Sequence, residues 1–229
     1  MKKLNFLGIA FLSIFFVQTQ AAVSPPQAKA FIQSLISEGI LYWKDKPYAE
    51  QVSKFKEIME TKFDLDGIAK RVLGERLWGY MDMKQRAAYL NLFRQMLLNR
   101  YSNKFSNYGG QNIVVVDASA SFKSFPIGVD SNNLKPQIVV TSELHNSGGA
   151  PVKVEWYVGE ENGHPIITDI TLAGPSMVAT EQATFTAIQR NPQNLKNARE
   201  LCKNAGAGAN KCIADKLIEE VMKYMLSAR

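Results

Sequence analysis

The hydrophobic period of the chain changes near residue 112, and this change restricts the fold more than any other feature. Four runs rich in β-branched residues follow: IVVVDA, QIVVTSEL, VKVEWYV and IITDITL. Runs of this kind are typical of strands. Residues 145–150 join the second run to the third, and residues 159–165, centred on Asn162-Gly163, join the third to the fourth. Short connections of this kind are typical of hairpins, so we predict a meandering antiparallel sheet of about four strands.

The third run is apolar on one side only. Val154 and Trp156 alternate with Glu155 and Tyr157, and successive side chains of a strand point to opposite faces. One face of the sheet is therefore expected to pack against helices, as in an α+β fold. We expect residues 119–135, between the first two runs, to form a loop or a ragged strand.

Residues 25–108 carry apolar side chains at helical spacing and are expected to form four helices. Asp64 is placed to cap the third of these helices. Asp82 and Gln85 form a variant of the capping box, which predicts the start of a long fourth helix.

The first 21 residues have the pattern of a cleaved signal peptide. Lys2 and Lys3 precede an apolar run and small residues up to Ala21. The run is about 14 residues long, shorter than the roughly 20 that a membrane-spanning helix needs, although an uncleaved anchor is the alternative. We therefore expect an exported protein, in a bacterial periplasm, whose residues 22–229 form a single α+β domain.

Two cysteines near the C-terminus predict a disulfide. Asn191-Pro192 is typical of a helix start, and a last helix is expected from about Asn210. Cys202 and Cys212 lie around the turn between these helices, and paired cysteines are usual in an oxidising compartment. Closing so small a loop contributes on the order of 3 kcal/mol in the chain-entropy model. Residues 191–229 are thus predicted to form a clipped helical hairpin, and a reactive or metal-binding cysteine pair is the weaker alternative.

The net charge of the chain excludes few classes of function. The formal net charge of +6 becomes +4 without Lys2 and Lys3, and the basic residues are scattered. Outside the cytoplasm such an excess points to anionic lipid surfaces or acidic partners. We expect no nucleic-acid partner.

Motifs of catalysis or metal binding are not evident in the sequence. His145 and His164 both fall in predicted turns. Ser176 lies in GPSMV, which lacks the second glycine of a nucleophile elbow. Asp169 lies in an apolar strand, and alternation favours a solvent-facing or hydrogen-bonded role over that of an acid with a raised pKa. We therefore predict no catalytic residue, no metal and no cofactor.

Aromatic and apolar residues recur every four positions along the predicted fourth helix: Tyr89, Phe93, Leu97, Tyr101 and Phe105. Such a stripe can pack in a core or line a cavity for an apolar ligand. Periodicity alone favours the core.

Several segments resemble the MlaC family, the periplasmic phospholipid-binding proteins of the toluene-tolerance type. The resemblance begins at Val72-Leu73-Gly74 with Trp78 and continues through the stripe described above to Tyr108-Gly109-Gly110. It is strongest at ITLAGPSM, residues 170–177, with Asp169 ahead of it. Ala173, Pro175 and Glu181-Gln182 depart from the family pattern.

The resemblance implies an NTF2-like fold with an apolar cavity between helices and sheet. It also implies the carriage of phospholipid between an inner-membrane ABC transporter complex with an MCE-type subunit and an outer-membrane lipoprotein–porin complex, which maintains outer-membrane lipid asymmetry. The cavity would have a first wall of Leu65, Ile68, Val72 and Leu73, a second wall of Tyr89, Phe93, Leu97, Tyr101 and Phe105, sheet residues Val139, Val154, Trp156, Ile170 and Leu172, and a mouth at Met177 and Val178.

Two other functions stay open at this stage. An NTF2-like enzyme acting on a small apolar substrate would need a buried acid, for which Asp169 is the candidate. A periplasmic adaptor would bind protein through a packed domain and would have no cavity for acyl chains.

Overall fold

The computed structural model describes residues 23–40, 46–106, 112–121, 137–145 and 149–228. The predicted signal peptide lies outside the described residues. So does most of the predicted loop between the first two strands, although residues 119–121 belong to a strand.

Helices come first, then strands, then helices again. The N-terminal part contains α1 (Pro25–Leu35), a π-helical turn (Ile36–Ile40), α3 (Tyr48–Lys62), α4 (Leu65–Leu73), α5 (Glu75–Tyr80) and α6 (Met83–Ser106). The remainder contains β1 (Asn112–Ser121), β2 (Gln137–His145), β3 (Val152–Glu161), β4 (His164–Leu172), α7 (Met177–Arg190), α8 (Pro192–Leu201), a 3-10 turn (Gly206–Gly208) and α9 (Ala209–Ser227). The predicted α+β class is confirmed, whereas α5 and α7 were not anticipated as separate helices.

Side-chain caps start the helices where the sequence predicts. Asp64 accepts a hydrogen bond from the Gly67 amide at 2.8 Å at the start of α4. Asp82 and Gln85 exchange side-chain to main-chain hydrogen bonds of 2.8 and 2.9 Å at the start of α6. These bonds satisfy amides that have no partner within the helix.

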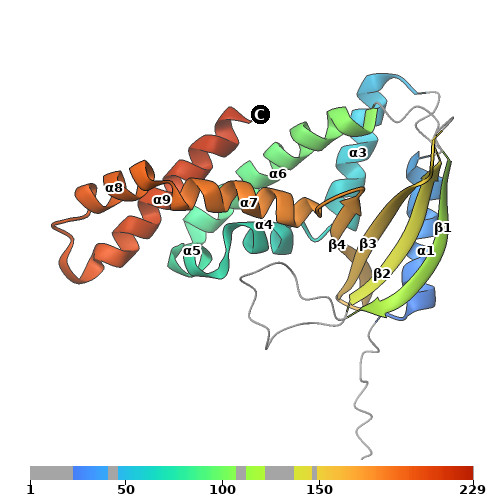
Figure 1. Cartoon of the computed structure of the whole chain (residues 1–229), viewed down its shortest axis with the longest axis horizontal. Coiled ribbons are helices and arrows are strands. Elements are labelled where there is room, and N and C mark those ends of the chain that lie inside the picture. The colour runs from blue at the N-terminus through green and yellow to red at the C-terminus, as the bar shows by residue number, and fades with distance from the viewer. Residues whose placement is uncertain (1–22, 41–45, 107–111, 122–136, 146–148, 229) are drawn as a thin grey trace, which may run out of the picture.

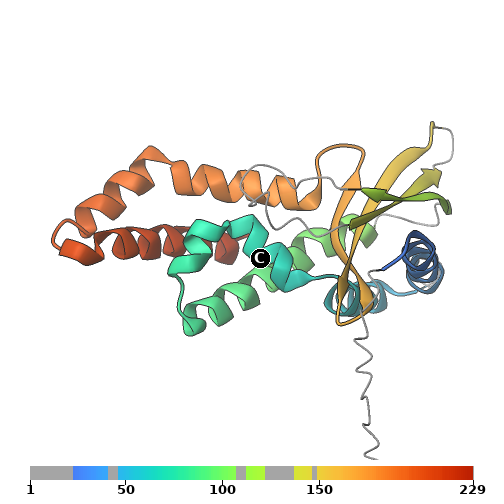
Figure 2. The same ribbon diagram turned by 90° about the horizontal axis from the view of Figure 1, so that it is seen from below.

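The four strands form one antiparallel sheet in the order β1-β2-β3-β4 (Figure 1). Val140 pairs with Trp156, and Trp156 pairs with Ile170, so these side chains share one face of the sheet. That face belongs to the main core together with Ile32 of α1, and α1 lies alongside the sheet in both views (Figure 2). Buried Trp156 donates from its indole nitrogen to the Ser142 hydroxyl at 2.9 Å.

A bulge in β4 changes which residues face the core. The register shifts between Tyr157 and Val158 of β3, so that Val158 pairs with Ile167 and Tyr157 with Asp169. Thr168 is the extra residue, and a bulge of this kind reverses the alternation on one side of it. Ile167 is consequently buried in the main core.

The outer edge of β4 is occupied by the chain on either side of it. Phe63 forms a parallel bridge with Ile167, and Ser176 forms an antiparallel bridge with Thr171. The Asp64 amide donates to the Ile167 carbonyl at 2.9 Å. These contacts join the start of α4 and the turn before α7 to the sheet.

The helical half of the molecule extends away from β4, and the α8–α9 hairpin lies at the end remote from the sheet (Figures 1 and 2). A disulfide joins Cys202 and Cys212, as predicted, with their Cα atoms 5.8 Å apart. Within the described part of the chain, no helix has the length and apolarity needed to cross a membrane.

Candidate functional site

Tyr89 and Phe93, in the first half of the α6 stripe, lie in a packed core. Tyr89 stacks on Phe93 with ring centroids 6.0 Å apart, and Phe185 of α7 meets both rings edge-on at 6.5 and 6.1 Å. The Tyr89 hydroxyl donates to the Ala69 carbonyl of α4 at 2.9 Å. These rings therefore pack directly on one another.

The other predicted wall residues are buried to different degrees. Tyr101 is half-buried, and the side chain of Phe105 lies outside the described residues. The buried members from the helices are Leu65, Ile68, Val72, Leu73, Leu97, Met177 and Val178.

The structure separates the predicted sheet residues into two groups. Val154, Trp156 and Ile170 lie on the face that belongs to the main core, and Leu172, at the end of this row, is 42 % exposed. Val139 lies on the opposite face, because it pairs with Tyr157, which in turn pairs with Asp169. Val139 is buried and yet is not part of the main core. The sequence grouped it with Trp156 because no register was available.

Asp169, on the same face as Val139, joins β4 to the start of α7. Its Oδ1 atom accepts hydrogen bonds from the main-chain amides of Val178 at 3.0 Å and Ile170 at 2.8 Å. The Ser176 hydroxyl caps α7 by accepting from the Ala179 amide at 3.1 Å. The carboxylate therefore lies at the positive end of α7, where negative charge is stabilised.

The expectation for Asp169 is confirmed for hydrogen bonding and wrong for exposure and acidity. The residue is only 2 % exposed. Burial raises the pKa of the Asp169 carboxyl, while hydrogen bonds from Ser176, Val178 and Ile170 and the charge of Arg71 oppose the rise. Strand alternation could not predict this burial, because the cover comes from α7, which the sequence did not reveal.

Arg71 joins α4 to the same corner, by which we mean the place where β4 meets the starts of α4 and α7. One of its terminal nitrogens donates to the Thr168 carbonyl at 2.7 Å, and the other lies 3.4 Å from the Asp64 carboxylate. Burial lowers the pKa of Arg71, and Asp64 opposes that effect. Gln182 of α7 donates to the Arg71 carbonyl at 3.4 Å, which satisfies a carbonyl near the end of α4.

A buried ion pair lies between α6, α7 and α9, and no pattern in the sequence indicates it. The fully buried Glu181 carboxylate is paired with Arg100 and accepts from the Tyr101 hydroxyl at 3.0 Å. Arg100 also donates to the Tyr224 hydroxyl at 2.6 Å. Burial and the charge of Glu181 raise the pKa of Tyr101. Asp169 and Glu181 are thus both held by hydrogen bonds or ion pairs within the protein, as is typical of carboxylates with a structural role.

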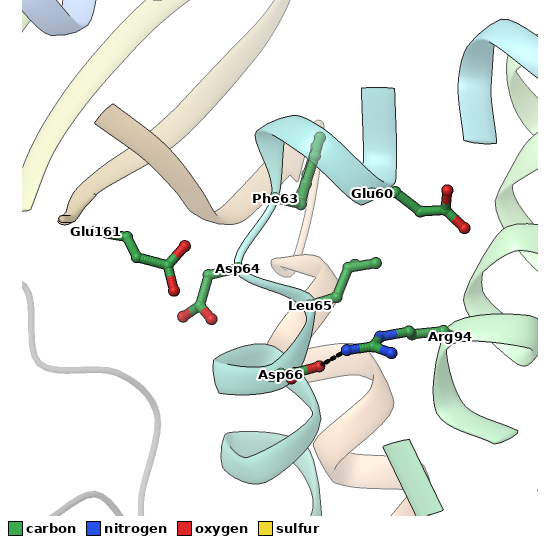
Figure 3. Close-up of a pocket in the computed structure, with 7 residues that line it drawn as sticks. All are labelled: Glu60, Phe63, Asp64, Leu65, Asp66, Arg94 and Glu161. Atoms are coloured by element: carbon green, nitrogen blue, oxygen red, sulfur yellow. Dashed lines mark hydrogen bonds and ion pairs between the residues drawn. The ribbon is translucent and has the colours of Figure 1, made fainter. Parts of the chain in front are cut away.

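A surface pocket of about 390 Å³ lies beside the corner, between the end of α3 and the start of α4 (Figure 3). Carboxylates dominate its lining, and Arg94 is paired with one of them, Asp66. The lining residues are Glu60, Phe63, Asp64, Leu65, Asp66, Arg94 and Glu161. Acyl chains would gain little from contact with such a surface. Among the described residues, no group of three or more His, Cys, Asp or Glu side chains is placed to hold a metal ion.

The fold and this site define an α+β protein with a packed helical half, joined to the sheet through a hydrogen-bonded corner. A family model for the MlaC protein matches residues 42–200. The chain therefore belongs to the MlaC family, as the resemblance implied.

The chain is also similar to a solved structure, that of a phospholipid-binding protein from Ralstonia solanacearum in complex with a phospholipid. The TM-score is 0.55 at 16 % sequence identity, and the similarity covers 85 % of this chain and 98 % of that one. At this level of identity the similarity establishes a shared fold. A search of curated proteins gives no match.

Proposed function

We propose that this member of the MlaC family is a periplasmic phospholipid carrier that buries the acyl chains of its ligand and releases them to a membrane complex. The observation that supports the proposal most strongly is the family match over residues 42–200. The shared fold with a protein solved together with a phospholipid supports it further.

The physical need for such a carrier follows from the chemistry of the ligand. Each methylene group hidden from water is worth about 0.8 kcal/mol. Two long acyl chains exposed to water would therefore cost roughly 20 kcal/mol. A protein that buries the chains about as well as a bilayer keeps loading and release nearly balanced, so docking to a partner can set the direction.

We place the acyl chains against the face of the sheet that carries Val139. This valine is buried but is not part of the main core, whereas Phe93 is packed between aromatic rings. Met177 and Val178, at the start of α7, would lie at the mouth, where Asp169 and Ser176 already supply polar atoms. The remaining predicted wall residues would form the rigid support behind this surface.

The compartment and partners belong to the same proposal. The N-terminal segment has the pattern of a signal peptide, and the Cys202–Cys212 disulfide is expected in an oxidising compartment. The carrier would exchange lipid with an inner-membrane ABC transporter complex that has an MCE-type subunit and with an outer-membrane lipoprotein–porin complex, and would so maintain outer-membrane lipid asymmetry. We infer that it does so without catalysis and without a cofactor.

Native mass spectrometry of the protein, purified from a periplasmic extract without detergent, tests the carrier proposal. We expect a bound mass that organic extraction identifies as phospholipid, near one per chain. A ligand-free mass, together with failure to take lipid from vesicles, would contradict the proposal and favour the adaptor.

A pair of substitutions tests the location of the acyl chains. Val139→Trp should occupy the proposed acyl-chain site, so that the variant folds but carries little lipid. Leu226→Trp is the matched control, because Leu226 is an exposed apolar residue of α9 and is not part of the sheet. Circular dichroism is used to check that both variants fold. If Val139→Trp folds and carries lipid normally, the chains lie elsewhere.

A further inference from the structure

The excess positive charge of the chain is concentrated in one segment. Residues 190–212 contain five basic residues and one acidic residue. Apart from the N-terminal Lys2 and Lys3, the rest of the chain carries twenty of each. The segment coincides with the end of α7, α8 and the turn of the hairpin. The sequence alone left this unnoticed because the basic residues are spaced apart within it.

Three of these cations surround a groove of about 460 Å³ at the junction of α7 and α8. Arg190, Lys196 and Arg199 line this basic groove together with Leu195 and Pro192. All three cations are exposed, and none has an ion pair among the residues that the structure describes. Glu200, at the margin of the basic groove, is paired with Lys203 at 2.5 Å.

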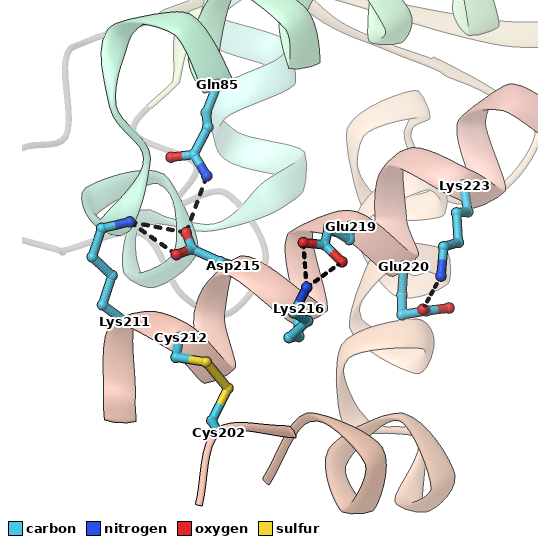
Figure 4. Close-up of polar contacts among 9 residues, drawn as sticks. All are labelled: Gln85, Cys202, Lys211, Cys212, Asp215, Lys216, Glu219, Glu220 and Lys223. Carbon is cyan, nitrogen blue, oxygen red and sulfur yellow. Dashed lines mark hydrogen bonds and ion pairs between the residues drawn. A yellow bond between two sulfur atoms is a disulfide. The ribbon is translucent and has the colours of Figure 1, made fainter. Parts of the chain in front are cut away.

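On α9, the other helix of the hairpin, the lysines do have ion-pair partners. Along α9, each of three lysines is paired with a carboxylate three or four residues away (Figure 4). The pairs are Lys211–Asp215 at 3.0 Å, Lys216–Glu219 at 2.8 Å and Lys223–Glu220 at 2.6 Å. Such pairs are the ordinary use of charge on a solvated helix. The unpaired cations of the basic groove therefore differ from the paired lysines of α9.

We propose that the basic groove is a docking surface for the anionic headgroups of a lipid bilayer. Arginine guanidinium groups bind phosphate oxygens in pairs of hydrogen bonds, and the recess between Arg190, Lys196 and Arg199 can receive a phosphate group. The position of the hairpin, at the end of the molecule remote from the sheet, leaves the proposed lipid-carrying surface clear of the bilayer (Figure 1).

The lining of the groove favours a headgroup over an acidic protein. Protein interfaces are organised around buried aromatic or aliphatic anchors, whereas the basic groove offers only Leu195 and Pro192 among its cations. A few unpaired cations give weak attraction that salt screens. A contact of this kind would hold the protein near a membrane and still let it leave.

Flotation of the full mature chain with vesicles tests the proposal. The vesicles contain phosphatidylcholine alone or with 30 % phosphatidylglycerol added, in a series of NaCl concentrations. We expect binding to the anionic vesicles only, lost at high salt. The triple variant Arg190→Gln/Lys196→Gln/Arg199→Gln should bind about 100-fold more weakly, since each cation near an anionic surface contributes about fivefold.

The variant Lys211→Gln/Lys216→Gln/Lys223→Gln is the matched control, because it changes the net charge equally on α9. We expect it to lose less than about fivefold. Equal losses in the two triple variants, or equal binding to both vesicles, would overturn the proposal. So would binding of the wild type to polyglutamate but not to anionic vesicles.

This proposal and the carrier function fail in distinguishable ways. Val139→Trp should retain its binding to anionic vesicles even where it carries no lipid, and the triple variant of the basic groove should still carry phospholipid in native mass spectrometry. If Val139→Trp loses vesicle binding, the contact with vesicles runs through the acyl-chain site and the basic groove is not the docking surface.

Discussion

The aromatic core of the helical half and the Val139 face of the sheet contain similar apolar side chains in different surroundings. Around Phe93, ring packs on ring, and polar atoms such as the Tyr89 hydroxyl are satisfied within the core. Around Val139, the partners across the sheet are Ser119 and Tyr157, and Asp169 lies beyond Tyr157 in the same row, so apolar and polar groups alternate on one surface. A packed core and a binding surface are therefore distinguished by what each side chain contacts, since the residue types are shared.

The largest effect should come from breaking the aromatic core. Phe93→Ala removes the ring between Tyr89 and Phe185, and we expect a loss of about 3–5 kcal/mol in the free energy of unfolding, measured by urea denaturation. Met83→Ala, at a position of the same helix that is 87 % exposed, should change it by less than about 0.5 kcal/mol. If Phe93→Ala keeps its stability and loses only its lipid, the stripe lines the cavity and the contrast drawn above is wrong.

Substitutions in the buried Arg100–Glu181 ion pair test how strongly α7, which lies between the aromatic core and the sheet, is held in place. Glu181→Leu leaves the Arg100 guanidinium, whose side chain is 22 % exposed, without its carboxylate. We expect a loss of about 3 kcal/mol in thermal or urea unfolding. The double variant Arg100→Met/Glu181→Leu should recover much of that loss, because no charge is then left buried. A double variant no more stable than Glu181→Leu would show that the charge itself is not the cause.

A smaller effect is expected from the disulfide, which lies far from the sheet. Cys202→Ser/Cys212→Ser should lower the free energy of unfolding by about 2–3 kcal/mol through the greater freedom of the unfolded chain. In hydrogen exchange, the α8–α9 hairpin should lose protection and the sheet amides should keep most of theirs. Equal loss of protection in both regions would mean that the hairpin and the sheet unfold as one unit.

Asp169→Asn should have the smallest effect, and its sign depends on pH. Because burial raises the pKa of the Asp169 carboxyl in the folded protein, its contribution to stability is complete below the unfolded value near 4 and is lost as the pH rises through the folded value. The wild type should therefore gain stability relative to Asp169→Asn as the pH falls from 7 to 4. Urea denaturation at a series of pH values measures this difference. Unchanged lipid loading in the variant would also count against the enzyme alternative.

The sequence predicted those parts of the fold that depend on local chemistry. The strands and their antiparallel order follow from alternation and turn residues, and the caps at Asp64 and Asp82 from their spacing to later residues. Helix α7 was missed because threonines and a leading Gly-Pro-Ser segment obscure its apolar face. The β4 bulge was missed because alternation assumes one residue per pair, which Thr168 violates.

The candidate site was less predictable than the fold, because it depends on contacts between distant segments. Val139 could be assigned to a strand but not to a face, since the face depends on register and on which side α1 covers. The pairing of Glu181 with Arg100 joins residues 81 positions apart, with no local pattern to indicate it. Family resemblance indicated the ligand class, and it could not separate core residues from those that contact a lipid.

The chain segments that occupy the outer edge of β4 also bear on aggregation. An open strand edge can template pairing with another molecule, but here Phe63 and Ser176 bridge to β4 and the Asp64 amide donates to Ile167. A second chain could extend the sheet at this edge only after the start of α4 and the turn before α7 had moved away. The corner that holds Asp169 therefore also guards against self-association, and substitutions that loosen it should promote aggregation before they unfold the rest of the protein.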